Sequence, residues 1–214
     1  MANTNLAFGL QPISKFGSNV NNTGISGYTL YEIKNDNSNA IYQGSPVIPL
    51  STGFIDIVGA AAGGTVGLLG VFGGCEFVSS TTGKPVFSNQ WTGSGADSNF
   101  PIKAYVYDDP MQLYKIATDA SVTSEATLRG NVFANANFAA GASGSSTTGI
   151  SSAKLGVSTI ATTAALHLRI LGWQDDENNN DFASAGIPVI VRLNNHFNSP
   201  NGAIVAGTPS TTGV

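Results

Sequence analysis

Cys75 is the only cysteine in this chain of 214 residues, and it lies in the apolar stretch LLGVFGGCEFV. A reactive thiolate needs a cationic neighbour, a helix N-terminus or a metal to lower its pKa. The next residue is Glu76, a carboxylate that would raise this pKa instead. We therefore expect Cys75 to be a structural buried thiol, and a single cysteine also excludes an intrachain disulfide framework.

Asp108 and Asp109 are the adjacent carboxylates most suggestive of acid–base chemistry. Glycosidases use two carboxylates set about 5 to 9.5 Å apart across a cleft. Neighbouring residues on a strand point to opposite faces, so this pair would not converge. We expect a turn that ends a strand, because Pro110 follows and has no N–H to donate.

A second acidic group resembles part of a calcium-binding loop. An EF-hand needs Gly at position 6 and Glu at position 12, and counting from Asp175 these places hold Asn180 and Gly186. We expect a solvated hairpin tip; an adventitious Ca²⁺ site is the alternative. The acidic residues are Asp175, Asp176, Glu177 and Asp181.

The two histidines, His167 and His196, lie in strand-like segments. No second His, Cys or carboxylate stands at ligand spacing from His196, so we interpret it as a hydrogen-bonded residue at a strand end. The phosphate-loop, dinucleotide-binding and GxSxG patterns are missing. The sequence thus predicts no catalytic residue, no metal ligand set and no cofactor, and we expect a protein that is not an enzyme.

The charge pattern argues against two further classes of partner. The net charge is −4, and the nine Lys and Arg residues are scattered, whereas nucleic-acid binding needs clustered cations. Residues 57–75 are uncharged and long enough to span a membrane, but they contain seven glycines and lack cationic flanks. We expect neither nucleic-acid binding nor a membrane span. The first twenty residues do not read as a secretory signal, so we expect the protein to stay in the cytoplasm that makes it.

The remaining pattern is typical of an all-β protein. Short strand-like runs recur with turn signals between them, which predicts an antiparallel barrel- or sandwich-like body with little helix. Residues 163–173 and 187–197 form an expected hairpin with a long acidic tip, and residues 119–130 an expected helical turn capped by Ser121 or Thr123. Charged residues make up only 10% of the chain, which suits a surface partly covered by neighbours.

We divide the chain into four regions. Residues 1–27 lack a steady period and cannot form a core; they are either a loose terminus or an extended N-terminal arm that docks on a partner. Residues 28–138 form the barrel-like body, residues 139–152 a flexible Gly/Ser/Thr-rich loop, and residues 153–214 a β-hairpin region with a loose tail. The expected capsid-docking residues of the arm are Leu6, Phe8, Leu10, Ile13 and Phe16.

Four segments, taken in order, carry a resemblance to a known family: NTNLAFGLQPI near the start, LGVFGGCEFVSSTTGKPVFSNQW, AYVYDDPMQLYKIATDAS and VRLNNHF. Together they resemble the capsid decoration, or cement, proteins of tailed bacteriophages. The resemblance implies a β-rich homotrimer that binds the major capsid protein on the outer surface of an icosahedral virion, near its threefold axes. It implies synthesis in the host cytoplasm, and it carries over no catalytic residue.

Three other interpretations stay open. A receptor- or glycan-binding virion module, such as a head fibre or tail adhesin, would use Trp91, Trp173 and the six tyrosines to stack on sugars. A phage glycan hydrolase would use Asp108 or Asp109. A major shell subunit normally has a long spine helix, and no segment here sustains one.

Overall fold

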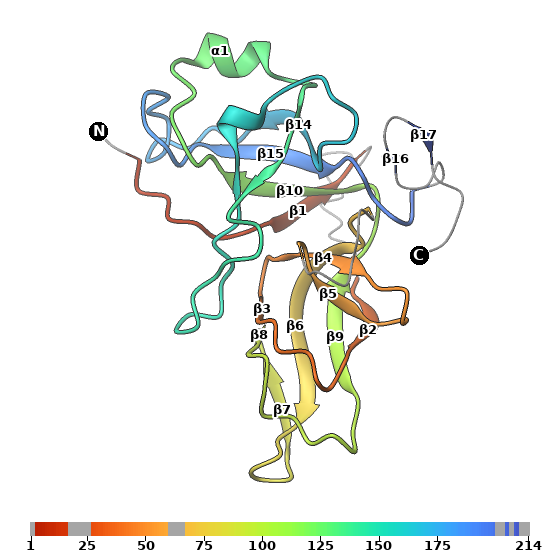
Figure 1. Ribbon diagram of the computed structural model, residues 1–214. Coiled ribbons are helices and arrows are strands. Elements are labelled where there is room, and N and C mark those ends of the chain that lie inside the picture. The colour runs from red at the N-terminus through yellow and green to blue at the C-terminus, as the bar shows by residue number, and fades with distance from the viewer. Residues whose placement is uncertain (1–2, 17–26, 60–66, 200–203, 206–207, 210–214) are drawn as a thin grey trace.

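The computed structural model describes residues 3–16, 27–59, 67–199, 204–205 and 208–209. They form two β units, a closed barrel and a five-stranded sheet, which meet where the chain passes from β9 to β10 (Figure 1). The single α-helix of the described residues, α1 (Glu125–Gly130), lies at the end of the molecule away from the barrel, and the β6–β7 hairpin projects at the other end.

The barrel closes because β4 pairs with both β5 and β6, giving the strand cycle β4-β5-β2-β9-β6. Every pairing is antiparallel except the single parallel pair of Ile33 with Ile55. Side chains alternate as the period of two requires: Ile102, Ala104 and Val106 on β9 point into the core. The bounds are β2 (Thr29–Ile33), β4 (Pro46–Pro49), β5 (Ile55–Ile57), β6 (Gly70–Val78) and β9 (Ile102–Tyr107).

Smaller elements extend the barrel. β7 (Pro85–Ser88) forms a hairpin with β6, and β3 (Ile41–Tyr42) pairs with β8 (Gln90–Trp91). Trp91 is fully buried, packs edge-on against Phe77 and donates its indole N–H to the Asn37 carbonyl. The Trp91 side chain therefore contributes to the core and is not available to stack on a sugar.

The second unit is an antiparallel sheet in the order β1-β10-β15-β14-β11. One face packs on a core shared with α1 and with Ile48, Leu68 and Val71 near the barrel. The strand bounds are β1 (Gln11–Lys15), β10 (Gln112–Ala117), β11 (Asn135–Ala136), β14 (Leu168–Trp173) and β15 (Pro188–Leu193). The short elements are β12 (Phe138–Ala139), β13 (Lys154–Leu155), the 3₁₀ helix η2 (Val157–Thr159), β16 (Ile204–Val205) and β17 (Thr208–Pro209).

The prediction of an all-β, antiparallel, barrel-containing fold with little helix is confirmed. The hairpin predicted for residues 163–173 and 187–197 is present as the antiparallel pair of β14 and β15. The helix is shorter than residues 119–130, and its cap is Ser124, not Ser121 or Thr123. Ser124 Oγ accepts the Thr127 N–H, whereas Ser121 Oγ instead bonds the Phe182 carbonyl and the Thr123 N–H.

The structure places the main boundary elsewhere than residue 138. The barrel strands end at Tyr107, and the chain then enters the sheet, so residues 112–138 belong to the second unit. Residues 11–15 join that sheet as β1, so the N-terminal segment is not wholly an extended arm. The 139–152 stretch folds back on itself and on β3: Ser151 is fully buried and Ile150 bridges Gln43. The conformation of residues 139–152 is therefore determined more by these backbone hydrogen bonds than by the Gly/Ser/Thr-rich composition.

Candidate functional site

An aromatic face on the outside of the barrel is the strongest candidate for a functional surface. Leu30 on β2 and Gly74 on β6 both pair with Tyr105 on β9, so all three share one outward-pointing row. Phe87 on β7 pairs with Glu76, so it lies on the same side of the sheet but one cross-strand row further along. We call this surface the aromatic face; its residues are Tyr28, Leu30, Gly73, Gly74, Phe87, Tyr105 and Tyr107.

Large apolar side chains on this face are open to solvent. Phe87 is 71% exposed, Leu30 57% and Tyr28 51%. Single exposed apolar residues are normal on protein surfaces, but a contiguous group marks a site of interaction. Part of the face, between Tyr28, Phe87 and Tyr105, is hollowed into a shallow groove of about 450 Å³.

Two glycines create the floor of the groove. A Cβ on Gly73 would lie 2.5 Å from Tyr28 Cε1, so the tyrosine ring rests directly on the bare backbone of β6. Gly74 has a φ of +153°, at a bulge in the β6–β9 pairing where few side chains are tolerated. The GGC sequence at residues 73–75 therefore produces both the floor of the groove and the bend beneath it.

The tyrosines are held by one another. The ring centroids of Tyr28 and Tyr107 are 4.4 Å apart, and the Tyr107 hydroxyl donates to the Tyr28 hydroxyl at 2.7 Å. Tyr105 meets Tyr28 edge-on at 5.7 Å and donates to Glu76 Oε2. Burial and the Tyr28 hydrogen bond raise the pKa of Tyr107, and burial and the Glu76 carboxylate raise the pKa of Tyr105. Both rings are thus neutral hydrogen-bonding groups at physiological pH.

The edge of the face is charged. The cross-strand row that ends at Phe87 also contains Glu32, Lys103 and Glu76, in register across β2, β9 and β6. An apolar centre with a polar rim is the usual arrangement of a surface that binds another molecule.

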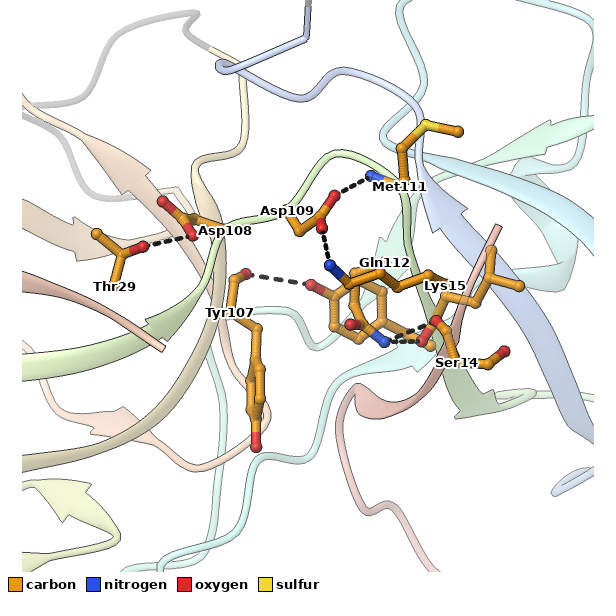
Figure 2. Close-up of polar contacts among 10 residues, drawn as sticks. Ser14, Lys15, Thr29, Tyr107, Asp108, Asp109, Met111 and Gln112 are labelled. Atoms are coloured by element: carbon orange, nitrogen blue, oxygen red, sulfur yellow. Dashed lines mark hydrogen bonds and ion pairs between the residues drawn. The ribbon is translucent and has the colours of Figure 1, made fainter. Parts of the chain in front are cut away.

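Asp108 and Asp109 are directed to different partners, as the strand geometry predicts (Figure 2). Asp108 accepts hydrogen bonds from Thr29 Oγ1 at 2.8 Å and from the Tyr31 hydroxyl at 2.7 Å, both on β2. Asp109 pairs with Lys15 Nζ at 2.7 Å and accepts the Met111 N–H at 2.8 Å. Burial and Asp108 together raise the pKa of Tyr31 to about 12. These carboxylates link structural elements and do not converge on a common point.

Cys75 is 1% exposed, and its thiol donates to the Gln90 carbonyl at 3.4 Å. Burial raises the pKa of this thiol to about 12, so it is protonated at neutral pH. His196 is likewise buried, and its Nδ1 accepts the Asn198 N–H. Burial lowers the pKa of His196 to about 4.

The acidic hairpin loop is organised by amides. Asn179 donates to Asp176, and its own carbonyl oxygen accepts the N–H groups of Thr4 and Asn5. Within residues 3–16, 27–59 and 67–199, no three His, Cys, Asp or Glu side chains are placed to hold a metal ion together. The loop therefore anchors the N-terminal segment.

The structure separates the five expected arm residues. Leu10 is 1% exposed and belongs to the core of the sheet unit, so its assignment as a docking residue is wrong. Gly9 and Gly44 explain its burial: the chain turns at Gly9, with φ +68°, and the Leu10 N–H bonds the Gly44 carbonyl. Leu6 and Phe16 are 83% and 52% exposed, while Phe8 and Ile13 are half-buried.

Sequence reasoning did not identify the aromatic face. The alternation of Tyr105 and Tyr107 with buried residues gave a signal for one strand, but only the register brings Tyr28, Leu30 and Phe87 beside them.

No α-helix in the described part of the chain is long and apolar enough to cross a bilayer. Comparisons with protein families, with characterised proteins and with solved structures gave no match to this chain.

Proposed function

We propose that this chain is a structural virion protein that decorates and stabilises an icosahedral phage capsid by binding the outer surface of the major capsid protein lattice. The single observation that supports this role best is the aromatic face: exposed Phe87, Leu30 and Tyr28 form one surface on a rigid, closed barrel. The partner is the major capsid protein, and the working unit is a homotrimer.

The chemistry of the surface favours binding over catalysis. Asp108 and Asp109 have structural partners, and Cys75 and His196 are buried. Apolar area contributes about 25 cal/mol per Å² on burial, before the costs of association. A specific interface buries about 800 Å² on each partner, more than the aromatic face alone provides, so neighbouring exposed residues contribute as well. Repetition over a lattice then turns weak contacts into strong retention.

The N-terminal segment supplies a second contact in this proposal. Leu6 and Phe16 are exposed at the two ends of the described part of the segment, and neither contributes to the core. Removing the whole segment would also remove β1 and Leu10 and would destabilise the sheet. The exchanges Leu6→Ser and Phe16→Ser test the contact without this damage.

The proposal is tested by cosedimentation of the purified chain with empty shells of the phage that encodes it. We expect Phe87→Asp and Leu30→Asp to reduce occupancy of the shells at least about tenfold, because a charge would have to be desolvated in the contact. Phe133→Asp is the matched control, since Phe133 is 75% exposed on the other unit. Equal loss with all three variants, or none with any, argues against the aromatic face as the contact.

A glycan-binding virion module is the second candidate, and the groove itself favours it. Tyr28 and Tyr105 expose aromatic rings beside a glycine floor, with Ser88 and Asn89 on the same rim. Sugars stack on aromatic rings and take hydrogen bonds from such polar groups. Saturable binding to a glycan array that is lost in Tyr28→Ala, with shell occupancy unchanged, would favour this function over decoration.

A further inference from the structure

The outer face of the five-stranded sheet carries two arginines in direct register. Arg169 on β14 is the cross-strand partner of Arg192 on β15. Both alternate with buried residues along their strands, so both side chains point away from the core. Like charges directly opposite one another destabilise an antiparallel pair. The free protein therefore keeps an unfavourable contact at this position.

No side-chain carboxylate neutralises this pair. All thirteen Asp and Glu residues belong to the part of the chain that the structure describes. The three ion pairs formed there include neither Arg169 nor Arg192. Arg169 Nε donates to the neutral side chain of Asn135 at 3.1 Å, which fixes its orientation. Arg192 Nε is buried and has no partner among the described residues.

A third cation and two apolar side chains complete the surface. Lys115 on β10 pairs with Ile190, two residues from Arg192, and is therefore a diagonal neighbour of Arg192. Leu113 pairs with Arg192 itself. Three of the nine Lys and Arg residues thus lie together on one half-buried face, although they are far apart in the sequence. Arginine beside apolar residues is the composition of an interface centre more than of a solvated sheet.

We propose that this cationic face, made of Lys115, Arg169 and Arg192 with Leu113 and Ile190, binds a short acidic segment of a protein partner. Guanidinium groups bind carboxylates through paired, charge-assisted hydrogen bonds. A glutamate or aspartate bound by Arg169 or Arg192 would neutralise a charge that forms no ion pair within the described part of the chain. The inference goes beyond shell decoration, because it holds whichever protein supplies the segment.

The charge distribution favours a short acidic peptide over a nucleic acid. Tight binding to DNA usually neutralises about six to ten phosphates, whereas this face offers three cations. The loop between β14 and β15 carries Asp175, Asp176 and Glu177 at the end of the same sheet. Asp176 already interacts with Lys115. A long polyanion that crossed the face would be repelled by all three carboxylates, whereas a segment of a few residues held by Arg169 and Arg192 would be repelled less.

The test uses the full chain and a fluorescent oligoglutamate peptide, with binding followed by anisotropy at low salt. We expect saturable binding that weakens at least about tenfold in Arg169→Gln and in Arg192→Gln, since each removes one charge from a paired contact. The matched control is Lys84→Gln, an exposed cation in the turn between β6 and β7, which should change the affinity less than about twofold. An oligolysine peptide should not bind.

Thermal unfolding without peptide separates recognition from a structural role. Arg192→Gln removes a like-charge contact, so it should unfold at the same temperature as the wild type or a higher one. The proposal is overturned if the wild type does not bind the peptide, or if the arginine variants bind it like the wild type. It is also overturned if an oligothymidylate of equal length binds more tightly. A change in oligomeric state on light scattering, caused by Arg192→Gln, would overturn it in favour of a second copy as the occupant.

Discussion

Lys15 Nζ lies 2.7 Å from Asp109 Oδ2, and this ion pair ties β1 to the turn at which the chain leaves the barrel (Figure 2). Nearby, the Tyr114 hydroxyl on β10 donates to the Tyr107 carbonyl at 3.1 Å, a bond from the sheet back to the last residue of β9. The two units are therefore connected by specific polar contacts as well as by the shared apolar core.

Lys15→Met should lower the free energy of unfolding by about 0.5 to 1 kcal/mol, because the pair is partly shielded from solvent. Asp109→Ala should cost about 1 to 2 kcal/mol, since it removes both the ion pair and the acceptor of the Met111 N–H. Urea unfolding measures both. Lys34→Met is the control: its pair with Asp36 is more exposed, so its loss should cost no more than about 0.3 kcal/mol. Equal effects of the two lysine changes would show that Lys15–Asp109 is an ordinary surface pair.

Gly73→Ala should alter the aromatic face, because the new methyl group would lie 2.5 Å from Tyr28 Cε1 and would displace the ring. Tyr28 is half exposed and can move, so we expect a loss of about 1 kcal/mol in stability and a changed tyrosine near-UV signal. Gly172→Ala on β14 is the matched control, since its Cβ would meet nothing within 4 Å. An unchanged tyrosine signal in Gly73→Ala would contradict the packing described for the groove floor.

His196 should make the protein less stable in acid. Burial lowers its folded-state pKa to about 4, with Arg192 acting in the same direction and Asp108 and Asp109 in part opposing it. In the unfolded chain this histidine has an ordinary pKa of about 6.5. Between the two pKa values the unfolded chain therefore binds a proton at this residue and the folded chain does not. Stability falls as the pH falls from about 6.5 to about 4, by up to about 1.4 kcal/mol per pH unit for this group.

His196→Gln removes this titration. Its unfolding free energy, measured by urea titration at several pH values, should have a shallower slope over the same window. His167, whose pKa burial also lowers, contributes to the slope that remains, as do Asp176 and Asp181, whose pKa values are lowered by hydrogen bonds. An identical pH slope in the wild type and the variant would show that His196 is not buried in its neutral form.

Cys75 should react slowly with thiol reagents in the native protein. Its pKa of about 12 leaves almost no thiolate at neutral pH, and the side chain is 1% exposed. We expect labelling by an aromatic disulfide to be at least about a hundredfold slower than in denaturant, because the residue reacts only in opened molecules. Rapid labelling of the native chain would contradict the packing of β6 against β8.

The sequence predicted the class of fold because period-two patterns and turns are local signals. Strand alternation at residues 102–107 and the 163–197 hairpin both agree with the structure. The unit boundary was not predictable in this way: β9 and β10 look like one continued pattern, and only long-range pairing assigns them to different units. The burial of Leu10 likewise depends on Gly44, which lies 34 positions further along the chain.

The candidate surfaces were the least predictable feature. Phe87 and Leu30 are ordinary strand residues in the sequence, and register alone places them around Tyr105. The same holds for Arg169 and Arg192, which are 23 positions apart in the sequence and directly opposite in the sheet. Chemical motifs are local in sequence, whereas a binding face is assembled from residues of several strands.

Image reconstruction of the assembled phage particle tests the proposed decoration function most directly. We expect density for the barrel and the five-stranded sheet on the outside of the shell, with Phe87 and Leu30 of the aromatic face against the major capsid protein. Particles in which this chain is missing from the outer surface, or lies there with the aromatic face turned to solvent, would contradict the account.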